Sequence, residues 1–234
     1  MAYASPFPGT GPWVEGWLSP ARYGVYLAEE AGDRGRALEL YEWNSALSCA
    51  VLHDLGHFEV ALRNAYAAAL DASWSGAGAA HWLDDPASPL RAPLLRTKKG
   101  GRRGTRRVDV NEKARQAIDA ARNRYGVHAP PGKIIAELPL GLWRYLSSAA
   151  HEKTLWVPYL HRAFPARTSR VVVDRKIGDL HELRNRAAHW EPLLAAPVAR
   201  RMSDLAWVAG LLGPELAAYI QHHSDVVDLL AKRP

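Results

Sequence analysis

The sequence from Leu183 to Pro192, at the end of a predicted helix, gathers side chains that could transfer a proton and bind a phosphate. Asn185 and His189 are four residues apart, so a helix would place them on one face, one turn from each other. Arg184 lies about 100° around the helix from Asn185, and its long side chain can reach the same place. The histidine stands near a helix C-terminus, where the helix dipole favours its protonated form.

This set of residue types suits the cleavage of RNA without a metal ion. A histidine can exchange a proton with the 2′-hydroxyl or the leaving 5′-oxygen near neutral pH. An arginine can hold the phosphate as its charge develops, and Asn185 would either hold His189 or orient the phosphate. Spacing alone favours a simpler interpretation, in which these polar residues only cap and bridge helices, because short patterns often match by chance.

Helices have to position these residues, because helical periodicity runs through almost the whole chain. Ser19-Pro20 and Asp33 are typical helix starts. Helices are expected over 44–70, 109–125, 134–146 with a break at 139–141, 155–160, 168–189 with Thr168 as cap, 198–212 and 214–230. The sequence therefore predicts an all-α helical bundle. We expect one domain over residues 1–234, with an N-terminal arm at 1–17 and extra N- and C-terminal helices.

The positive charge of the chain is concentrated in one segment. The net charge is +6, but residues 91–107 hold eight basic and no acidic side chains, so the rest of the chain sums to −2. Glycines loosen this backbone, and we expect residues 84–108 to form a flexible basic loop. Such a loop could follow the phosphates of RNA through Lys98, Lys99, Arg102, Arg103, Arg106 and Arg107. The simpler interpretation is a solvated insertion with no specific role.

Composition excludes several classes of protein. With 48% hydrophobic and 23% charged residues, the chain is neither disordered nor collagen-like, and its apolar runs are too short to span a membrane. The N-terminal residues show no secretory signal, which predicts a cytoplasmic protein. The single cysteine, Cys49, can form neither an internal disulfide nor a cysteine-based zinc site.

Two pairs of histidines are candidate metal ligands by residue type. His53 and His57 are four residues apart on a predicted helix, a spacing compatible with metal ligation. No third ligand of clear geometry follows them, so we expect ordinary histidines on a helix face, with no metal and no cofactor. His222 and His223 lie in the last predicted helix and are expected at the surface.

Several short motifs stand in an order that is similar to one protein family. Arg184 to His189 fits the pattern R-x-x-x-x-H with Asn after the Arg, and it follows segments at 18–27, 37–44, 58–65 and 134–143, with Trp156 and Phe164 between. Over about residues 18–195 the chain resembles the Abi-like (abortive infection) proteins of bacteria, within the HEPN superfamily. It departs from that family where Ala187 and Trp190 replace a common Ile and a second His.

The resemblance implies a HEPN-like fold and a metal-independent endoribonuclease that acts in phage defence, in abortive infection or as a toxin. It also implies a homodimer in which Arg184 and His189 of both chains face one cleft, with an antitoxin or another defence protein as a further partner. The alternative is a catalytically inactive RNA-binding or protein-interaction module with the same fold.

Four further residues are expected to support the site: Glu191, Trp190, Arg63 and Asn64. Trp190 would shield the site, stack on a base or anchor the helix end. Arg63 and Asn64 repeat the Arg-Asn pair of the motif without its histidine, and Arg63 is expected to pair with Glu59 one turn earlier.

Overall fold

The computed structural model describes residues 9–76, 80–99 and 104–234, and most of these residues are helical. The helices are α1 (Trp13–Leu18), α2 (Pro20–Glu29), α3 (Arg34–Asp71), α4 (Glu112–Tyr125), α5 (Pro131–Glu137), α6 (Leu140–Leu146), α7 (Arg170–Ala188), α8 (Val198–Leu212), α9 (Pro214–His222) and α10 (Val226–Ala231). Strands β1 (Leu95–Lys99) and β2 (Thr105–Asp109) pair as an antiparallel hairpin. The predicted all-α fold is confirmed.

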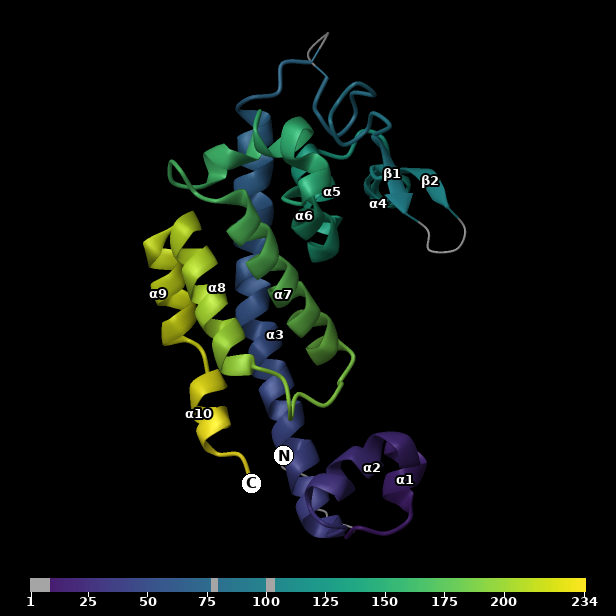
Figure 1. Ribbon diagram of the computed structural model, residues 1–234, viewed down its shortest axis with the longest axis vertical. Coiled ribbons are helices and arrows are strands. Elements are labelled where there is room, and N and C mark those ends of the chain that lie inside the picture. The colour runs from purple at the N-terminus through teal and green to yellow at the C-terminus, as the bar shows by residue number, and fades with distance from the viewer. Residues whose placement is uncertain (1–8, 77–79, 100–103) are drawn as a thin grey trace.

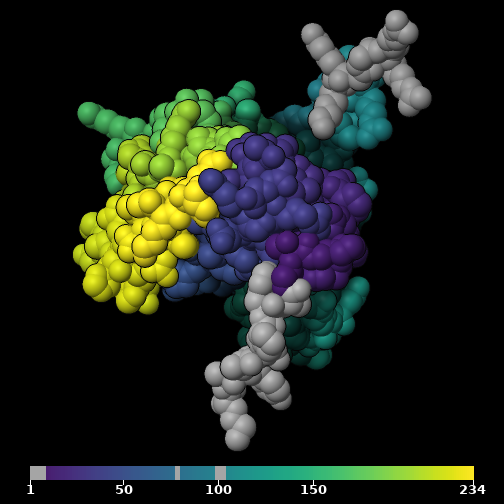
Figure 2. All heavy atoms as spheres, turned by 90° about the horizontal axis from the view of Figure 1, so that it is seen from below, coloured from purple at the N-terminus to yellow at the C-terminus, as the bar shows by residue number. Residues whose placement is uncertain are grey.

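Helix α3 is the axis of the molecule (Figure 1). Six helices pack along it, namely α2, α5, α6, α7, α8 and α10, whereas α1 packs on α2, α4 on α5 and α9 on α8. Its 38 residues extend about 57 Å at 1.5 Å per residue. Helix α7 runs antiparallel beside it, and α8 packs against both. Seen from below, the C-terminal helices lie directly against α3 (Figure 2). None of the helices within the described ranges is long and apolar enough to cross a membrane.

The core forms where helical periodicity brings apolar side chains of α3 to one side. Those buried along α3 include Leu40, Leu47, Val51, Leu55, Phe58 and Leu62. They belong to one cluster with Ile177, Leu180 and Leu183 of α7 and Leu205 and Val208 of α8. Each such side chain contributes about 1.5–3 kcal/mol when it is fully buried, so packing along α3 fixes the position of α7.

Local capping signals explain where α2 and α3 begin. Ser19 accepts a hydrogen bond from the N–H of Arg22 at 3.4 Å, and Asp33 accepts one from the N–H of Arg36 at 3.0 Å. These side chains satisfy backbone donors that the first turn of a helix leaves unpaired. Both predicted helix starts are confirmed, and α3 continues from this cap without a break through the segment predicted as helix from residue 44.

Other boundaries differ from the prediction. Helix α1 occupies part of the expected N-terminal arm, α4 begins at Glu112, and the last predicted helix is divided into α9 and α10. Ser169, not Thr168, is the N-cap residue of α7, because the Thr168 hydroxyl donates to the Pro165 carbonyl at 2.6 Å instead. The expected helix at 155–160 is replaced by short 3₁₀ and π turns over Ala149–His151, Glu152–Trp156 and Leu160–Ala163.

The predicted basic loop contains a β-hairpin, which is a correction. Thr97 pairs with Arg107 and Lys98 with Arg106 in the register of the two strands. Gly104 has a φ of 75°, a backbone conformation that glycine adopts without strain. Gly104, one of the glycines that suggested a loose loop, therefore adopts a left-handed conformation directly before β2.

A polar network fixes the base of the hairpin. The carboxylate of Asp109 accepts hydrogen bonds from the N–H groups of Leu94 at 2.8 Å and Asn111 at 3.0 Å, and it pairs with Arg115. The buried amide of Asn111 donates to the carbonyls of Pro89 and Ala92. These bonds define the direction in which the two strands leave the body of the protein.

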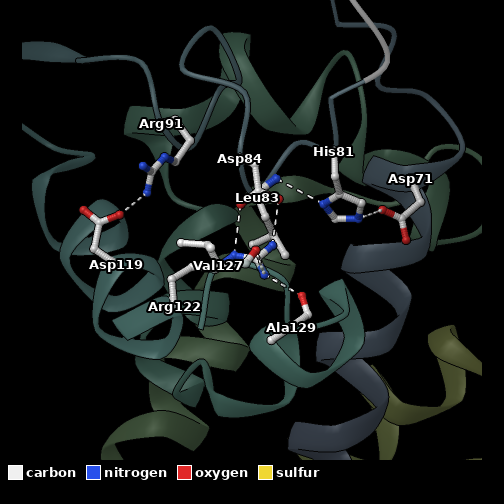
Figure 3. A network of polar contacts seen from close by, with 9 residues as sticks. All are labelled: Asp71, His81, Leu83, Asp84, Arg91, Asp119, Arg122, Val127 and Ala129. Atoms are coloured by element: carbon white, nitrogen blue, oxygen red, sulfur yellow. Dashed lines mark hydrogen bonds and ion pairs between the residues drawn. The ribbon is translucent and has the colours of Figure 1, made fainter. Parts of the chain in front are cut away.

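The chain between α3 and the hairpin is fastened to α4 (Figure 3). Arg122 of α4 binds both carboxylate oxygens of Asp84, at 2.7 and 3.0 Å, and Arg91 pairs with Asp119 at 2.5 Å. On the α3 side, His81 pairs with Asp71 at 3.1 Å. The segment predicted as a flexible insertion is thus tied to two helices before β1 begins.

Candidate functional site

Helix α7 ends in a turn that leaves His189 exposed to solvent. The N–H of Trp190 donates to the Ala187 carbonyl at 3.0 Å, and the N–H of Glu191 donates to the Arg186 carbonyl at 2.9 Å. This pair of bonds is the Schellman motif, in which the residue after the C-cap adopts a left-handed conformation. Here that residue is Trp190, with a φ of 55°, although glycine is the usual choice at this position.

Two other helices hold the backbone of this turn. The buried side chain of Asn44, in α3, accepts from the N–H of Leu193 at 2.7 Å and donates to the Glu191 carbonyl at 3.5 Å. Arg22, in α2, donates to the His189 carbonyl at 3.3 Å. These contacts fix the main chain around His189 and leave its side chain at the surface.

Glu191, predicted as a supporting residue, helps to close the same turn. Its carboxylate pairs with the guanidinium of Arg186 at 3.5 Å, and Arg186 also donates to the Pro192 carbonyl. Both side chains of the ion pair are partly exposed, so its own contribution to stability is small. Glu191 thus acts on the shape of the turn through Arg186.

Asn185 lies one turn before His189, as the spacing predicts, and the two residues share a backbone hydrogen bond of 3.0 Å. The Asn185 side chain, however, lies toward His181, with Nδ2 3.3 Å from Nε2 of the ring. The expectation that this amide holds His189 is therefore wrong in this structure. The reason is that His181, four residues earlier in the helix, is partly buried and takes the amide as its partner.

His181 and Arg144 are candidates that the sequence analysis missed. They lie where α6 crosses α7, and two glycines allow the close approach. A methyl group on Gly141 would lie 3.1 Å from Nε2 of His181, and one on Gly178 would lie 2.9 Å from the Arg144 guanidinium. The sequence does hold a signal for this crossing. A glycine inside a helix, where no turn requires it, often marks close packing.

The electrostatics of this crossing favour a neutral imidazole. Burial lowers the pKa of His181 below its usual value, and the positive charges of Arg144 and Arg184 lower the pKa further. At neutral pH the site therefore presents an unprotonated imidazole beside two guanidinium groups. Such a group can accept a proton, and guanidinium groups bind phosphate.

His181 and His189 are eight residues apart, which places them about 12 Å from each other along the helix. A general acid and a general base that act on one phosphate have to lie within hydrogen-bond reach of the reacting oxygens. The backbone positions of the two histidines in one chain lie farther apart than that reach.

Arg63 and Asn64 lie away from this site. They follow Asn44 by 19 and 20 residues along α3, so Arg63 stands about 28 Å along the helix from the turn that carries His189. Its guanidinium donates to the Ala136 carbonyl at 3.1 Å, near the end of α5, and forms no ion pair with Glu59 in the described part of the chain. The predicted pair with Glu59 is therefore wrong, and Arg63 links α3 to α5 instead.

Four of the six cations predicted to bind RNA stand in the two strands. Arg106 and Arg107 are exposed on β2 and point to opposite faces of it, because successive strand residues alternate. The backbones of Lys98 and Lys99 lie in β1, but their side chains, like Arg102 and Arg103, lie outside the described residues. Arg96 fastens its strand to the body through the Ala150 carbonyl at 3.0 Å.

Comparisons with known proteins found no protein-family model, no curated protein and no solved structure that matches the chain. The resemblance to the Abi-like proteins stays a prediction from the quoted motifs. A functional assignment has to rest on the geometry of α7 and on that resemblance.

Proposed function

We propose that the protein is a metal-independent endoribonuclease in which His189 transfers a proton during cleavage. The 2′-oxygen of the RNA would attack the adjacent phosphorus as its proton is removed, and the bond from phosphorus to the 5′-oxygen would break as that oxygen gains a proton. The observation that carries the proposal is the exposed imidazole of His189 on a turn whose backbone is fixed by Asn44 and Arg22. A catalytic group needs this combination of access and fixed position.

The cluster at the α6–α7 crossing supplies the remaining chemistry. Arg184 and Arg144 would offset the charge that develops on the phosphate, as fixed cations do in other phosphoryl-transfer sites. Because His181 and His189 of one chain are about 12 Å apart, an acid and a base for one phosphate would come from two chains. This supports the homodimer with a composite site that the family resemblance implies.

The basic hairpin would guide the substrate. Arg106 and Arg107 are exposed on β2, and their charges can contact phosphates without reading the sequence of the RNA. Trp190 follows His189 directly and is 38% exposed, so its ring is accessible for stacking on a base. In the cell, we infer a cytoplasmic role in phage defence, in abortive infection or as a toxin that an antitoxin restrains.

A catalytically inactive RNA-binding module with the same fold is the second candidate. One observation favours it: the amide of Asn185 is occupied by His181, so His189 lacks the neighbour expected to orient it. Both candidates bind RNA, and they differ in whether His189 is needed for strand cleavage.

The deciding experiment measures cleavage of end-labelled RNA by the full chain in EDTA. We expect His189→Ala to lower the rate by a factor of about 100 to 10,000 while RNA binding persists. The matched control is His128→Ala, at an exposed histidine in the connection between α4 and α5, which should keep the wild-type rate. RNA binding without cleavage by the wild-type protein would establish the inactive module, and equal rates for wild type and His189→Ala would reject His189 as a catalytic residue.

A further inference from the structure

A second group of histidines lies on the other side of α3 from the α7 turn. His53 follows Asn44 by nine residues, which corresponds to about half a turn around the helix and about 14 Å along it. Asn44 faces the segment after α7, so His53 faces away from it. Any role of this group is therefore separate from that of His189.

The side chains of His53 and His57 approach each other through their Nε2 atoms. The two Nε2 atoms are 3.4 Å apart, and the ring planes stand at 88° to each other. Two nitrogens that each bind one zinc ion at about 2.0–2.1 Å in tetrahedral geometry are themselves about 3.4 Å apart. The separation of the two Nε2 atoms thus equals the separation that two ligands of one ion require.

A buried carboxylate sets the orientation of the first ring. Nδ1 of His53 lies 3.0 Å from the carboxylate of Asp54, and the other Asp54 oxygen accepts from the Ser224 hydroxyl at 2.5 Å. Asp54 is fully buried, whereas the His53 side chain is 49% exposed. Since the carboxylate can only accept, Nδ1 of His53 carries a proton, and in the neutral ring Nε2 then presents a lone pair. Metal-binding histidines usually have such a carboxylate partner.

The second ring is held by α9. Tyr219 packs edge-on against His57 with ring centroids 5.4 Å apart, and His223 packs on Tyr219 at 4.4 Å. This packing restrains the His57 ring in the position where its Nε2 meets that of His53. Both rings are thus pre-positioned, which lowers the cost of ordering them around an ion.

We propose that His53 and His57 bind a divalent transition-metal ion, such as Zn²⁺ or Ni²⁺, through their two Nε2 atoms. Without metal, Nε2–H of His57 donates to Nε2 of His53. On binding, the proton of His57 moves to its Nδ1 through solvent, so both nitrogens offer lone pairs and no net proton is released. In the described part of the chain no three His, Cys, Asp or Glu side chains gather as a ligand set, so water would complete the coordination. An open site of this kind binds its ion reversibly.

The test is calorimetric titration of Ni²⁺ into untagged full-length protein that has been stripped with EDTA and desalted. We expect one ion per chain, at least tenfold weaker binding in His57→Ala, and unchanged binding in His128→Ala. Asp54→Asn keeps both ligand rings but replaces the oriented carboxylate, and should weaken binding by a factor of about 10 to 100.

Two results would overturn the proposal: no binding at 0.1 mM Ni²⁺, or equal binding by wild type and His57→Ala. If the variants fold poorly, modification of wild-type histidines by diethyl pyrocarbonate provides a second measurement. Ni²⁺ should protect His53 and His57 but not His128, and equal modification with and without Ni²⁺ would contradict the site. RNA cleavage in EDTA tests the proposed nuclease separately.

Discussion

Asn44 and Leu193, 149 residues apart in the chain, are joined by a hydrogen bond of 2.7 Å from the Leu193 N–H to the Asn44 side-chain oxygen. Asn44 is fully buried and also donates to the Glu191 carbonyl. The central helix thus sets the path of the chain just after His189.

Asn44→Ala should destabilise the protein by about 1–3 kcal/mol, because it leaves a buried N–H without a partner. If His189 is catalytic, the variant should also cleave RNA more slowly under conditions where it is fully folded. Urea denaturation measures the first effect. Asn64→Ala, at an exposed position on the same helix, is the control and should change stability by no more than about 0.5 kcal/mol. Equal stability of the two variants would mean that the Asn44 hydrogen bonds contribute nothing net.

Trp190 allows the strain of the α7 turn to be measured. Trp190→Gly and Trp190→Ala both remove the ring, but only alanine must still hold a φ of 55° against steric repulsion. The glycine variant should therefore be more stable than the alanine variant by about 1 kcal/mol. Ala188→Gly, inside α7, should show the opposite order and cost up to about 1 kcal/mol. The urea midpoints of Trp190→Gly and Trp190→Ala measure this difference. An alanine variant as stable as the glycine variant would contradict the strain at position 190.

The hairpin is expected to contribute charge and no base specificity. Replacing Arg106 and Arg107 with glutamine should weaken RNA binding for all sequences alike. The slope of log affinity against log salt concentration should fall by about 1.4, since each contact to single-stranded RNA contributes about 0.7. The control removes two other exposed cations, Arg200 and Lys232. If both double variants keep the wild-type slope, the hairpin does not contact RNA phosphates.

His151 should make stability depend on pH. It is 1% exposed, and its burial, together with the nearby Arg96, lowers its pKa from 6.5 to about 4. Because the unfolded chain binds this proton more readily, stability is full above pH 6.5 and falls as the pH drops toward 4, by about 3 kcal/mol in total. His151→Phe keeps an aromatic ring beside Tyr145 and should lose this part of the pH dependence. Urea unfolding of the wild type and His151→Phe between pH 7 and pH 4 measures the effect. If the free energy of unfolding changes with pH equally in both proteins, His151 is not its cause.

The sequence predicted those parts of the fold that local signals determine. Ser19 and Asp33 each stand at the helix start where their type is favoured, because a cap depends on only a few neighbouring residues. The hairpin was not predicted, because the local signal for a strand is absent there. Half of the residues in its two strands are basic, so the alternation of apolar and polar residues that identifies a strand is missing.

In the candidate site, too, only the features that depend on local spacing could be predicted. The one-turn spacing of Asn185 and His189 follows from the helix alone and was predicted. The roles of Arg144 and His181 depend on where α6 crosses α7, and the partner of Arg63 depends on where α5 ends. Such contacts join distant parts of the chain, and no spacing within a single segment reveals them.

The long central helix also has a consequence for the synthesis of the protein. Trp43, Asn44 and Asp54 of α3 find their hydrogen-bond partners in Leu229, Leu193 and Ser224. A chain that leaves the ribosome from its N-terminus completes α3 long before these partners emerge. During that interval the part of α3 that α7, α8 and α10 cover is exposed. We therefore expect the nascent protein to depend on chaperones more than its modest size would suggest.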